Sequence, residues 1–308
     1  IMKGLLSLGE LISFVTLLGF FTGPLSRLIT LQPQLEEISV AQKRLGEILD
    51  LPEEKTEDSG KMIPDQAKGD ISIKNLNFSY GTRGTTLCDI NLDIKSGEKV
   101  AFVGPSGSGK TTLMKLLLKF YKEETGSITL DGINIKDMET SSYRKLFGYV
   151  PQEILLFSGT IEQNIAFGNG ETRAEDILKA AAEAQSLDFI SKLPERFQTK
   201  VGERGASLSG GERQRIALAR ILLRKPKIFI FDEATSSLDS ICEAEILKTI
   251  NEISKNTTTL IVAHRLSTIK NADKIFVLEN GRIVESGNHK SLLRQKGLYA
   301  KMWENQEG

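Results

Sequence analysis

The feature that most restricts how this chain can fold is the segment GPSGSGKT at residues 104–111, which matches the pattern GxxxxGK[ST]. An apolar run, KVAFV at 99–103, precedes it, and the helix-favouring run TTLMKLLLKF follows from residue 111. A glycine-rich loop between a strand and a helix lets backbone N–H groups turn toward phosphate oxygens, and the helix N-terminus adds partial positive charge. The sequence therefore predicts a phosphate-binding loop; the alternative is a glycine-rich turn without function.

Other apolar runs resemble the strand before this loop. They are KIFIF at 227–231, TTTLIVAH at 257–264 and KIFVL at 274–278. Strands that alternate with helical stretches predict an α/β fold with a parallel sheet covered on both faces. Residues 174–193 and 209–224 read as helices between the runs at 99–103 and 227–231, which predicts an inserted helical subdomain.

The strand IFIFD at residues 228–232 ends in Asp232 and is followed by Glu233. In phosphoryl transfer, Lys110 would reach the β- and γ-phosphates, and Thr111 and Asp232 would hold Mg²⁺. Glu233 would polarise the attacking water as a general base. An apolar run that ends in two acids is often only a strand reaching the surface, but here it accompanies the phosphate loop.

Composition excludes several classes of protein. The 308 residues contain 40 basic and 40 acidic side chains, so no net charge favours binding to nucleic acid. Cys88 and Cys242 are far apart in sequence, which excludes a disulfide scaffold and indicates a cytosolic setting for this part of the chain. His264 and His289 are too few for a metal site built on imidazole.

The N-terminal region is membrane-like, because no charge occurs from Leu11 to Ser26. Those residues alone would span about 24 Å as a helix, whereas Leu5 to Leu31 would be long enough for a hydrocarbon core of about 30 Å. The sequence therefore predicts one transmembrane helix. A signal peptide is the alternative, but one lysine and no small-residue cleavage site argue against it.

The pattern changes after this span. Apolar residues three and four apart from Pro33 to Leu51 predict that the helix continues, and Lys43 and Arg44 place this side in the cytosol. Residues 52–69 are rich in charges, proline and glycine, which is typical of a linker. We expect a transmembrane helix with a cytosolic extension over 1–51, a linker over 52–69 and a nucleotide-binding domain over 70–308.

A second potential anion site begins at Leu208, where the sequence reads LSGGE. A serine and two glycines at a helix start can present a hydroxyl and bare amides to an anion, although an ordinary capped helix has the same pattern. With the phosphate loop, this segment resembles the signature of the ATP-binding cassette (ABC) family. The resemblance implies an α/β P-loop NTPase domain with an antiparallel β subdomain and an inserted helical subdomain, preceded by one transmembrane helix.

The resemblance extends over residues 70–306. It implies that Tyr80 in NFSYG stacks on adenine, that Gln152 in YVPQE meets Mg²⁺ and the attacking water, and that His264 in VAHR contacts the γ-phosphate. A buried strand aromatic is the alternative for Tyr80, and a structural role is the alternative for His264. The loop Ser237, Leu238 and Asp239 would cross the interface between two such domains.

The predicted catalytic residues are Glu233, His264 and Gln152. The predicted metal ligands are Thr111, Gln152 and Asp232. The predicted nucleotide-binding residues are Tyr80, Gly104, Pro105, Ser106, Gly107, Ser108, Gly109, Lys110, Thr111, Thr112, Ser209, Gly210, Gly211 and Glu212. ATP and Mg²⁺ are the expected ligands, and a second copy of the domain is the expected partner.

The segments 155–168 and 201–205 resemble exporter-type ABC domains, where they receive short helices from the membrane domains. The N-terminal fifty residues look most like bacterial exporters of bacteriocins and competence peptides, which implies a plasma-membrane location and a peptide cargo. We expect five further membrane helices, and any cysteine peptidase domain, upstream of Ile1. The alternatives are an exporter of lipid or drug-like substrates, a soluble ABC ATPase without a transport role, and a degenerate domain that binds ATP without hydrolysis.

Overall fold

The computed structural model describes residues 7–51, 53–54, 58, 61–64, 67–82, 84–235, 238, 240–263 and 265–307. By its internal contacts the chain divides into two compact units, Ile1–Glu57 and Asp58–Gly308. The division falls within the interval 52–69 that the sequence predicts as a linker.

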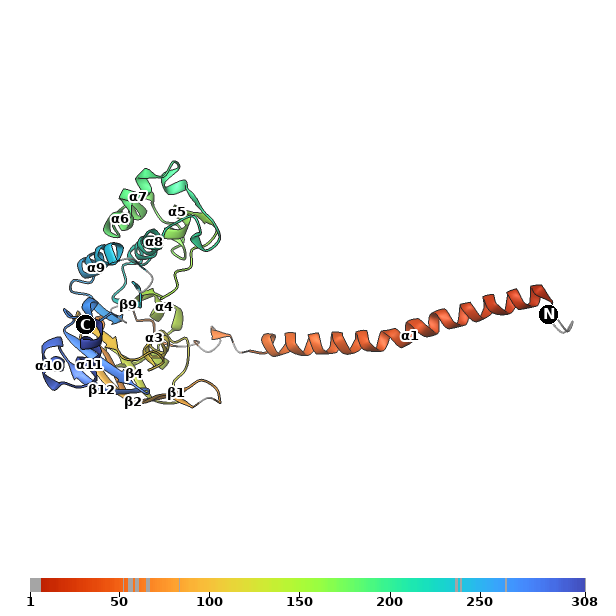
Figure 1. The fold of residues 1–308 in the computed structure, drawn as a ribbon, viewed down its shortest axis with the longest axis horizontal. Coiled ribbons are helices and arrows are strands. Elements are labelled where there is room, and N and C mark those ends of the chain that lie inside the picture. Colours follow the sequence, from red (N-terminus) through yellow and green to blue (C-terminus); the bar gives the residue numbers. More distant parts are fainter. Residues whose placement is uncertain are drawn as a thin grey trace. The chain divides into compact units, whose positions relative to one another are not determined.

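The first unit consists mainly of one helix, α1 (Leu8–Leu49), drawn in red and orange in Figure 1. Ser7 and Glu10 cap its start reciprocally, since the Ser7 N–H donates to Glu10 Oε2 at 2.8 Å and the Glu10 N–H donates to Ser7 Oγ at 3.2 Å. By length and apolar composition, α1 can cross a membrane. Its 42 residues rise about 63 Å, so the helix is longer than a bilayer core and continues beyond the predicted span.

The second unit begins with an antiparallel sheet of four strands. In spatial order they are β2 (Thr85–Ile94), β1 (Ile71–Ser79), β4 (Thr125–Leu130) and β5 (Ile133–Asn134). Apolar side chains of β1 and β2 are buried, among them Ile73, Phe78, Leu87 and Ile90. The predicted antiparallel β subdomain is confirmed.

A six-stranded sheet forms the centre of this unit. Its spatial order is β12 (Arg282–Gly287), β11 (Lys274–Glu279), β3 (Lys99–Val103), β10 (Thr258–Val262), β9 (Ile228–Asp232) and β6 (Phe147–Val150). All neighbours are parallel except β12, which is antiparallel to β11. The four strands predicted as apolar runs are confirmed, whereas the sequence reading missed β6 and β12, which are the two outer strands.

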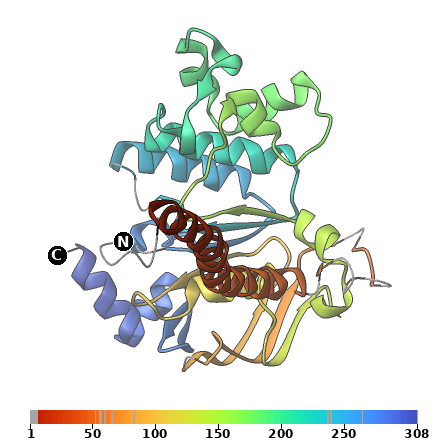
Figure 2. The ribbon, with the colours of Figure 1, turned by 90° about the vertical axis from the view of Figure 1, so that its right-hand side faces the viewer.

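Both faces of the central sheet are buried. On β3, Val100 and Phe102 pack with the antiparallel sheet and α3 (Lys110–Leu117), whereas Ala101 and Val103 pack with the helical layer. This alternation follows from the two-residue period of a strand. Figure 2 shows the layers of the second unit, with the helices of residues 161–223 in green to cyan on one side and the strands of residues 71–94 in orange on the other.

The predicted helical insertion is confirmed between β3 and β9. It contains α5 (Ile161–Ala166), α6 (Ala174–Glu183), α7 (Leu187–Lys192) and α8 (Gly210–Leu223), which Figure 1 shows together. The single helix predicted over 174–193 is wrong in one respect, because the chain turns between α6 and α7. Gln185 has φ +53° there, a left-handed conformation that a continuous right-handed helix cannot contain.

Further elements complete the unit. They are η1 (Ile135–Asp137), α4 (Thr140–Lys145), β7 (Gly159–Thr160), η2 (Arg196–Gln198), β8 (Lys200–Val201), η3 (Glu203–Gly205), α9 (Ser240–Ile253), η4 (Leu266–Thr268), α10 (His289–Gln295) and α11 (Leu298–Glu307).

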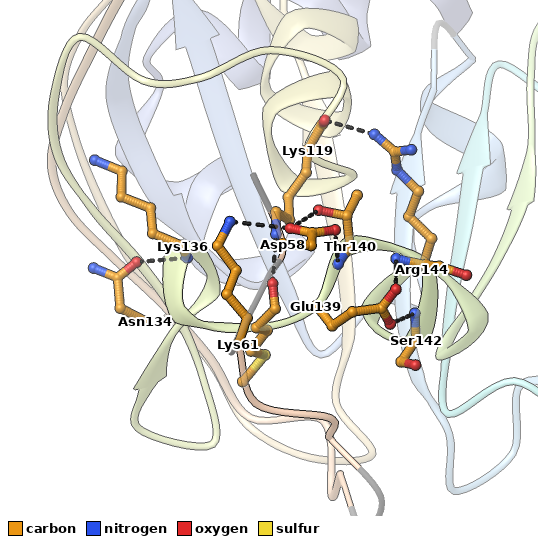
Figure 3. A network of polar contacts seen from close by, with 11 residues as sticks. Asp58, Lys61, Lys119, Asn134, Lys136, Glu139, Thr140, Ser142 and Arg144 are labelled. Atoms are coloured by element: carbon orange, nitrogen blue, oxygen red, sulfur yellow. Dashed lines mark hydrogen bonds and ion pairs between the residues drawn. The ribbon is translucent and has the colours of Figure 1, made fainter. Parts of the chain in front are cut away.

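Two described residues of the predicted linker, Asp58 and Met62, are hydrogen-bonded to η1 and α4 and to the residues between them (Figure 3). Asp58 accepts hydrogen bonds from the Thr140 N–H at 2.8 Å and the Thr140 hydroxyl at 3.0 Å, and it pairs with Lys61 at 3.0 Å. The Met62 N–H donates to the Asp137 carbonyl at 2.9 Å, and the Met62 carbonyl accepts from the Glu139 N–H at 2.7 Å. This part of the predicted linker is therefore bound to the second unit.

Candidate active site

The phosphate loop, residues 104–111, connects β3 to α3 as predicted. Gly104 and Gly109 have φ of +148° and +100°. A Cβ on Gly104 would lie 2.0 Å from the Leu278 carbonyl oxygen, and a Cβ on Gly109 would lie 2.5 Å from the Leu87 Cδ2. Only glycine fits both positions. Gly109 is the N-cap of α3 and provides no side-chain cap, which leaves the first amides of the helix available to an anion.

Lys110 is buried at the base of this loop, with 4% of its surface exposed. Its Nζ donates to the carbonyl oxygens of Gly104 and Pro105, both at 2.9 Å, and to Ser108 Oγ at 3.3 Å. Burial lowers the pKa of the ammonium group, and the nearby carboxylates of Glu233 and Asp232 raise it. The lysine thus holds a positive charge inside the loop.

Replacing Lys110 with Ala is expected to weaken ATP binding roughly 10- to 100-fold, the value of one or two hydrogen bonds to a charged group. Isothermal titration with ATP would measure this change. Lys74, exposed on β1, lies outside this loop and provides the control as Lys74→Ala. Unchanged affinity in Lys110→Ala would remove the lysine from phosphate binding.

Asp232 ends β9 and is 1% exposed. Its Oδ1 accepts a hydrogen bond from the Thr111 hydroxyl at 3.0 Å, and its Oδ2 accepts one from the Tyr149 hydroxyl at 3.3 Å. Burial raises the pKa of Asp232, whereas the bond from Thr111 lowers it. The structure therefore brings together two predicted metal ligands, Thr111 and Asp232.

Tyr149 was not among the predicted site residues. It lies on β6 beside β9, where it is paired in register with Ile230. Burial raises the pKa of the Tyr149 hydroxyl above its usual range, so the group remains a hydrogen-bond donor to Asp232. No sequence pattern indicates this contact, because β6 is short and its neighbour in the sheet is about eighty residues away along the chain.

Glu233 follows Asp232 at the carboxyl end of β9. Its backbone is left-handed, with φ +52°, and its N–H donates to the Val262 carbonyl at 2.9 Å. Such a conformation is uncommon for a residue other than glycine and occurs preferentially at functional sites.

One cavity of about 370 Å³ is bordered by the phosphate loop, Gln152 and Glu233. It is lined by Thr86, Ser106, Gly107, Gly109, Lys110, Thr111, Thr112, Gln152 and Glu233. Thr86, on β2, is the one lining residue that the sequence reading did not include. A larger cavity of about 580 Å³ beside α6 contains none of the predicted site residues. The smaller cavity is the candidate site, because it brings the loop, Gln152 and Glu233 together.

Tyr80 lies next to this cavity in a cluster of aromatic rings. Phe78 and Tyr121 meet it edge-on, with ring centroids 4.9 and 5.0 Å away, and its hydroxyl donates to Thr112 Oγ1 at 3.2 Å. Thr112 itself lines the cavity. This location is compatible with both readings of Tyr80, as an adenine platform and as part of the packed β subdomain.

Replacing Tyr80 with Ala is expected to weaken ATP binding by about 1 to 3 kcal/mol, the range for base stacking on aromatic side chains, whereas Tyr80→Phe should be mild. Equilibrium binding of a fluorescent ATP analogue would measure both variants. Tyr121→Ala is the control, because it removes a ring from the same cluster and leaves Tyr80. If Tyr121→Ala weakened binding as much as Tyr80→Ala, ring packing rather than stacking on the base would explain the effect.

The signature segment lies at the start of α8. The Ser209 N–H donates to Glu212 Oε2 at 2.8 Å, and the Glu212 N–H donates to Ser209 Oγ at 3.3 Å, which forms a capping box. Gly211 is close-packed, since a Cβ there would lie 3.3 Å from Cys242 Sγ. None of the four residues 209–212 lines the candidate cavity, so the structure does not bring this segment to the phosphate loop of the same chain.

Some predicted residues cannot be placed. His264, Ser237 and Asp239 lie outside the described residues, and their roles remain predictions. Leu238, between the latter two, is described and is 7% exposed.

Comparison with known proteins found a matching family model and similar sequences. Residues 87–236 match the family model described as ABC transporter. The chain is 41% identical over its whole length to the uncharacterized ABC transporter ATP-binding protein YwjA of Bacillus subtilis, covering 54% of that protein. It is 43% identical to the alpha-hemolysin translocation ATP-binding protein HlyB of Escherichia coli O157:H7, over 99% of this chain and 43% of that protein.

Two further similarities extend this result. The transport/processing ATP-binding protein ComA of Streptococcus pneumoniae is 43% identical over 97% of this chain and 42% of its own length. The structure of a bacterial Atm1-family ABC exporter with ATP bound superimposes with a TM-score of 0.82 at 37% identity, over 100% of this chain and 54% of the other. The chain spans about half the length of these relatives.

Proposed function

The chain belongs to the ABC transporter family, and on that premise we propose that it hydrolyses ATP between two copies of itself to drive the export of a peptide. The family consists of ATPases, and the chain carries the ATP-binding domain of an exporter. The observation that carries the proposed chemistry is the shared cavity of the phosphate loop, Gln152 and Glu233.

In this proposal each group has one task. The loop amides and Lys110 bind the β- and γ-phosphates, and Tyr80 supports the adenine. Glu233, at the edge of the same cavity, accepts a proton from the attacking water. Gln152 orients that water, and His264 contacts the γ-phosphate as the family resemblance implies.

The residues around Asp232 fit a magnesium ion. The Thr111 hydroxyl, the Asp232 carboxylate and the Gln152 amide provide oxygen ligands, which Mg²⁺ prefers, and the first two are already hydrogen-bonded to each other. When bound with ATP, Mg²⁺ would neutralise charge on the phosphates. Removal of Mg²⁺ with EDTA should therefore abolish hydrolysis.

A second copy of the chain is the proposed partner at the nucleotide. The signature residues do not reach the phosphate loop of their own chain, and Ser209 is exposed at the N-terminus of α8. A helix N-terminus favours anions, so it can cover the γ-phosphate held by another chain. Because one sequence contains both halves, a symmetric dimer would have two complete sites.

Membrane attachment is proposed from α1 and from an apolar surface on the second unit. Phe157 and Phe167 stack with ring centroids 4.1 Å apart, remain 46% and 47% exposed, and border a groove of about 360 Å³. These residues belong to the segment 155–168 that resembles the docking site for membrane-domain helices. We propose that α1 crosses a bacterial plasma membrane and that the second unit lies in the cytosol.

The peptide cargo is proposed from the relatives, whose names include alpha-hemolysin translocation and leukotoxin translocation. The alternatives of lipid or drug-like cargo predict a different activator of hydrolysis. In the complete transporter, peptides should stimulate ATP hydrolysis, and stimulation by lipids alone would favour the alternative.

A further inference from the structure

A buried carboxylate, Glu243, lies on α9 outside the cavity described above. The residue is 7% exposed. Its Oε1 accepts a hydrogen bond from the Thr235 hydroxyl at 3.1 Å, and its Oε2 forms an ion pair with the Arg265 guanidinium. One side chain on a helix thus holds two loop residues that are thirty positions apart in sequence.

Both partners of Glu243 lie within two residues of a proposed catalytic residue. Thr235 is two residues after Glu233, and Arg265 comes immediately after His264. The two segments leave neighbouring parallel strands, because Asp232 at the end of β9 is in register with Val262 at the end of β10. Glu243 therefore connects the two loops at the point where they diverge from the sheet.

The same region encloses a small cavity of about 30 Å³. Glu233, Thr235, Ala263 and Arg265 are among the residues that line it. Glu233 and the Arg265 segment therefore face a common space, and a shift of one loop changes the surroundings of the other. Loss of the bonds from Glu243 would remove one connection between the two loops and leave the bond from the Glu233 N–H to the Val262 carbonyl.

Other bonds fix the Arg265 segment on its remaining sides. The Ala263 N–H donates to the Phe102 carbonyl at 3.3 Å, and the Leu266 N–H donates to Gln306 Oε1 at 2.8 Å. The backbone on both sides of Arg265 is therefore held by β3 and α11. Glu243 adds a contact from α9 and, through Thr235, connects the Arg265 segment to the Glu233 loop.

A second ion pair on α9 provides a matched comparison. Glu245 pairs with Arg215 of α8, but its side chain is 54% exposed, compared with 9% for Glu243. Each pair joins a more buried and a more exposed side chain, since the side chains of Arg215 and Arg265 are 16% and 46% exposed. The two glutamates thus differ in burial and in what they hold, although they share a helix and a residue type.

We propose that Glu243 is a positioning residue that sets the location of the Glu233 loop relative to the Arg265 segment, through Thr235 and Arg265. The proposal rests on the proposed function, since it assigns a purpose to the alignment of these two loops. Glu243 does not reach the nucleotide in this account. It acts by holding the two loops in one arrangement.

The first test measures hydrolysis by the full chain with Glu243→Gln, which keeps an acceptor for Thr235 and removes the charge opposite Arg265. We expect kcat to fall about tenfold and KM to stay within about threefold, because misplacement of catalytic groups slows the reaction without removing nucleotide contacts. Glu245→Gln should remain within about twofold of the unsubstituted chain. A kcat for Glu243→Gln within twofold of the unsubstituted value would overturn the proposal.

A double variant tests whether Arg265 acts through the same contact. Arg265→Gln alone should also lower kcat, and combining it with Glu243→Gln should add little, since either change removes the same interaction. Fully additive effects would show that the two residues act separately and would contradict the proposal.

A measurement without catalysis separates this proposal from the proposed function. Amide hydrogen exchange at residues 233–235 and 265–268 should be at least about tenfold faster in Glu243→Gln than in Glu245→Gln, with β3 and β11 as internal references. Unchanged exchange in both segments would overturn the positioning role. A chain that shows this exchange difference and hydrolyses no ATP would contradict the proposed function and leave the positioning role supported.

Discussion

Glu233→Gln is expected to lower ATP hydrolysis by at least about two orders of magnitude, since a general base contributes roughly 10²- to 10⁴-fold. Glutamine has nearly the same shape as glutamate but cannot accept the proton of the attacking water. Glu233 follows β9 in a left-handed conformation and lines the cavity of the phosphate loop. Because the loop and Lys110 are unchanged, ATP affinity should be retained.

Phosphate release under single-turnover conditions would measure this loss, and equilibrium ATP binding would verify that the site is intact. Glu279→Gln is a suitable control, because Glu279 ends β11 on the same sheet but does not line the cavity. Hydrolysis within tenfold of the unsubstituted chain would remove Glu233 from the role of general base.

Ser209→Arg should abolish the ATP-dependent dimer while ATP still binds to the monomer. Ser209 is exposed at the start of α8 and does not line the cavity of its own chain. In the proposed dimer, the arginine side chain would occupy the space of the γ-phosphate held by the partner. The expected effect is therefore confined to association.

Sedimentation of Glu233→Gln with ATP and Mg²⁺ gives the reference, in which trapped nucleotide should convert monomer to dimer. The substitution of Ser209 also removes a helix cap, which is worth about 1 kcal/mol, so Ser209→Ala serves as the control for that loss. If the Ser209→Arg chain still formed the dimer with ATP, the signature segment would not lie at the interface.

The phosphate loop and the ends of the central strands could be predicted because their signals are local. KVAFV and IFIFD are continuous apolar runs, as expected for parallel strands buried on both faces, and glycines at 104 and 109 report positions where a Cβ would collide with neighbouring atoms. The order of strand, loop and helix then indicated that the carboxylates at the end of β9, Asp232 and Glu233, lie near the phosphate loop. This part of the site follows from short segments of sequence.

What the sequence did not reveal depends on contacts between distant segments. The Tyr149 bond to Asp232 requires β6 to lie beside β9, and β6 is a short outer strand that contains Gly148. The bonds of Glu243 to Thr235 and Arg265 depend on how α9 packs against two loops. No periodicity or motif encodes such pairings, so they emerge only from the folded chain.

The separation of the two anion sites is a third case. Sequence alone identified residues 104–111 and 208–212 as phosphate-binding candidates, and the structure places only the first at the cavity. Under the proposed function, the second segment acts at the phosphate loop of another chain.

Whether a second copy completes each nucleotide site can be measured from the specific ATPase activity of the chain as a function of its concentration. Activity per molecule should rise with protein concentration as monomers associate, and then reach a plateau. Constant specific activity over a hundredfold range, together with a monomer in sedimentation at every ATP concentration, would contradict this expectation.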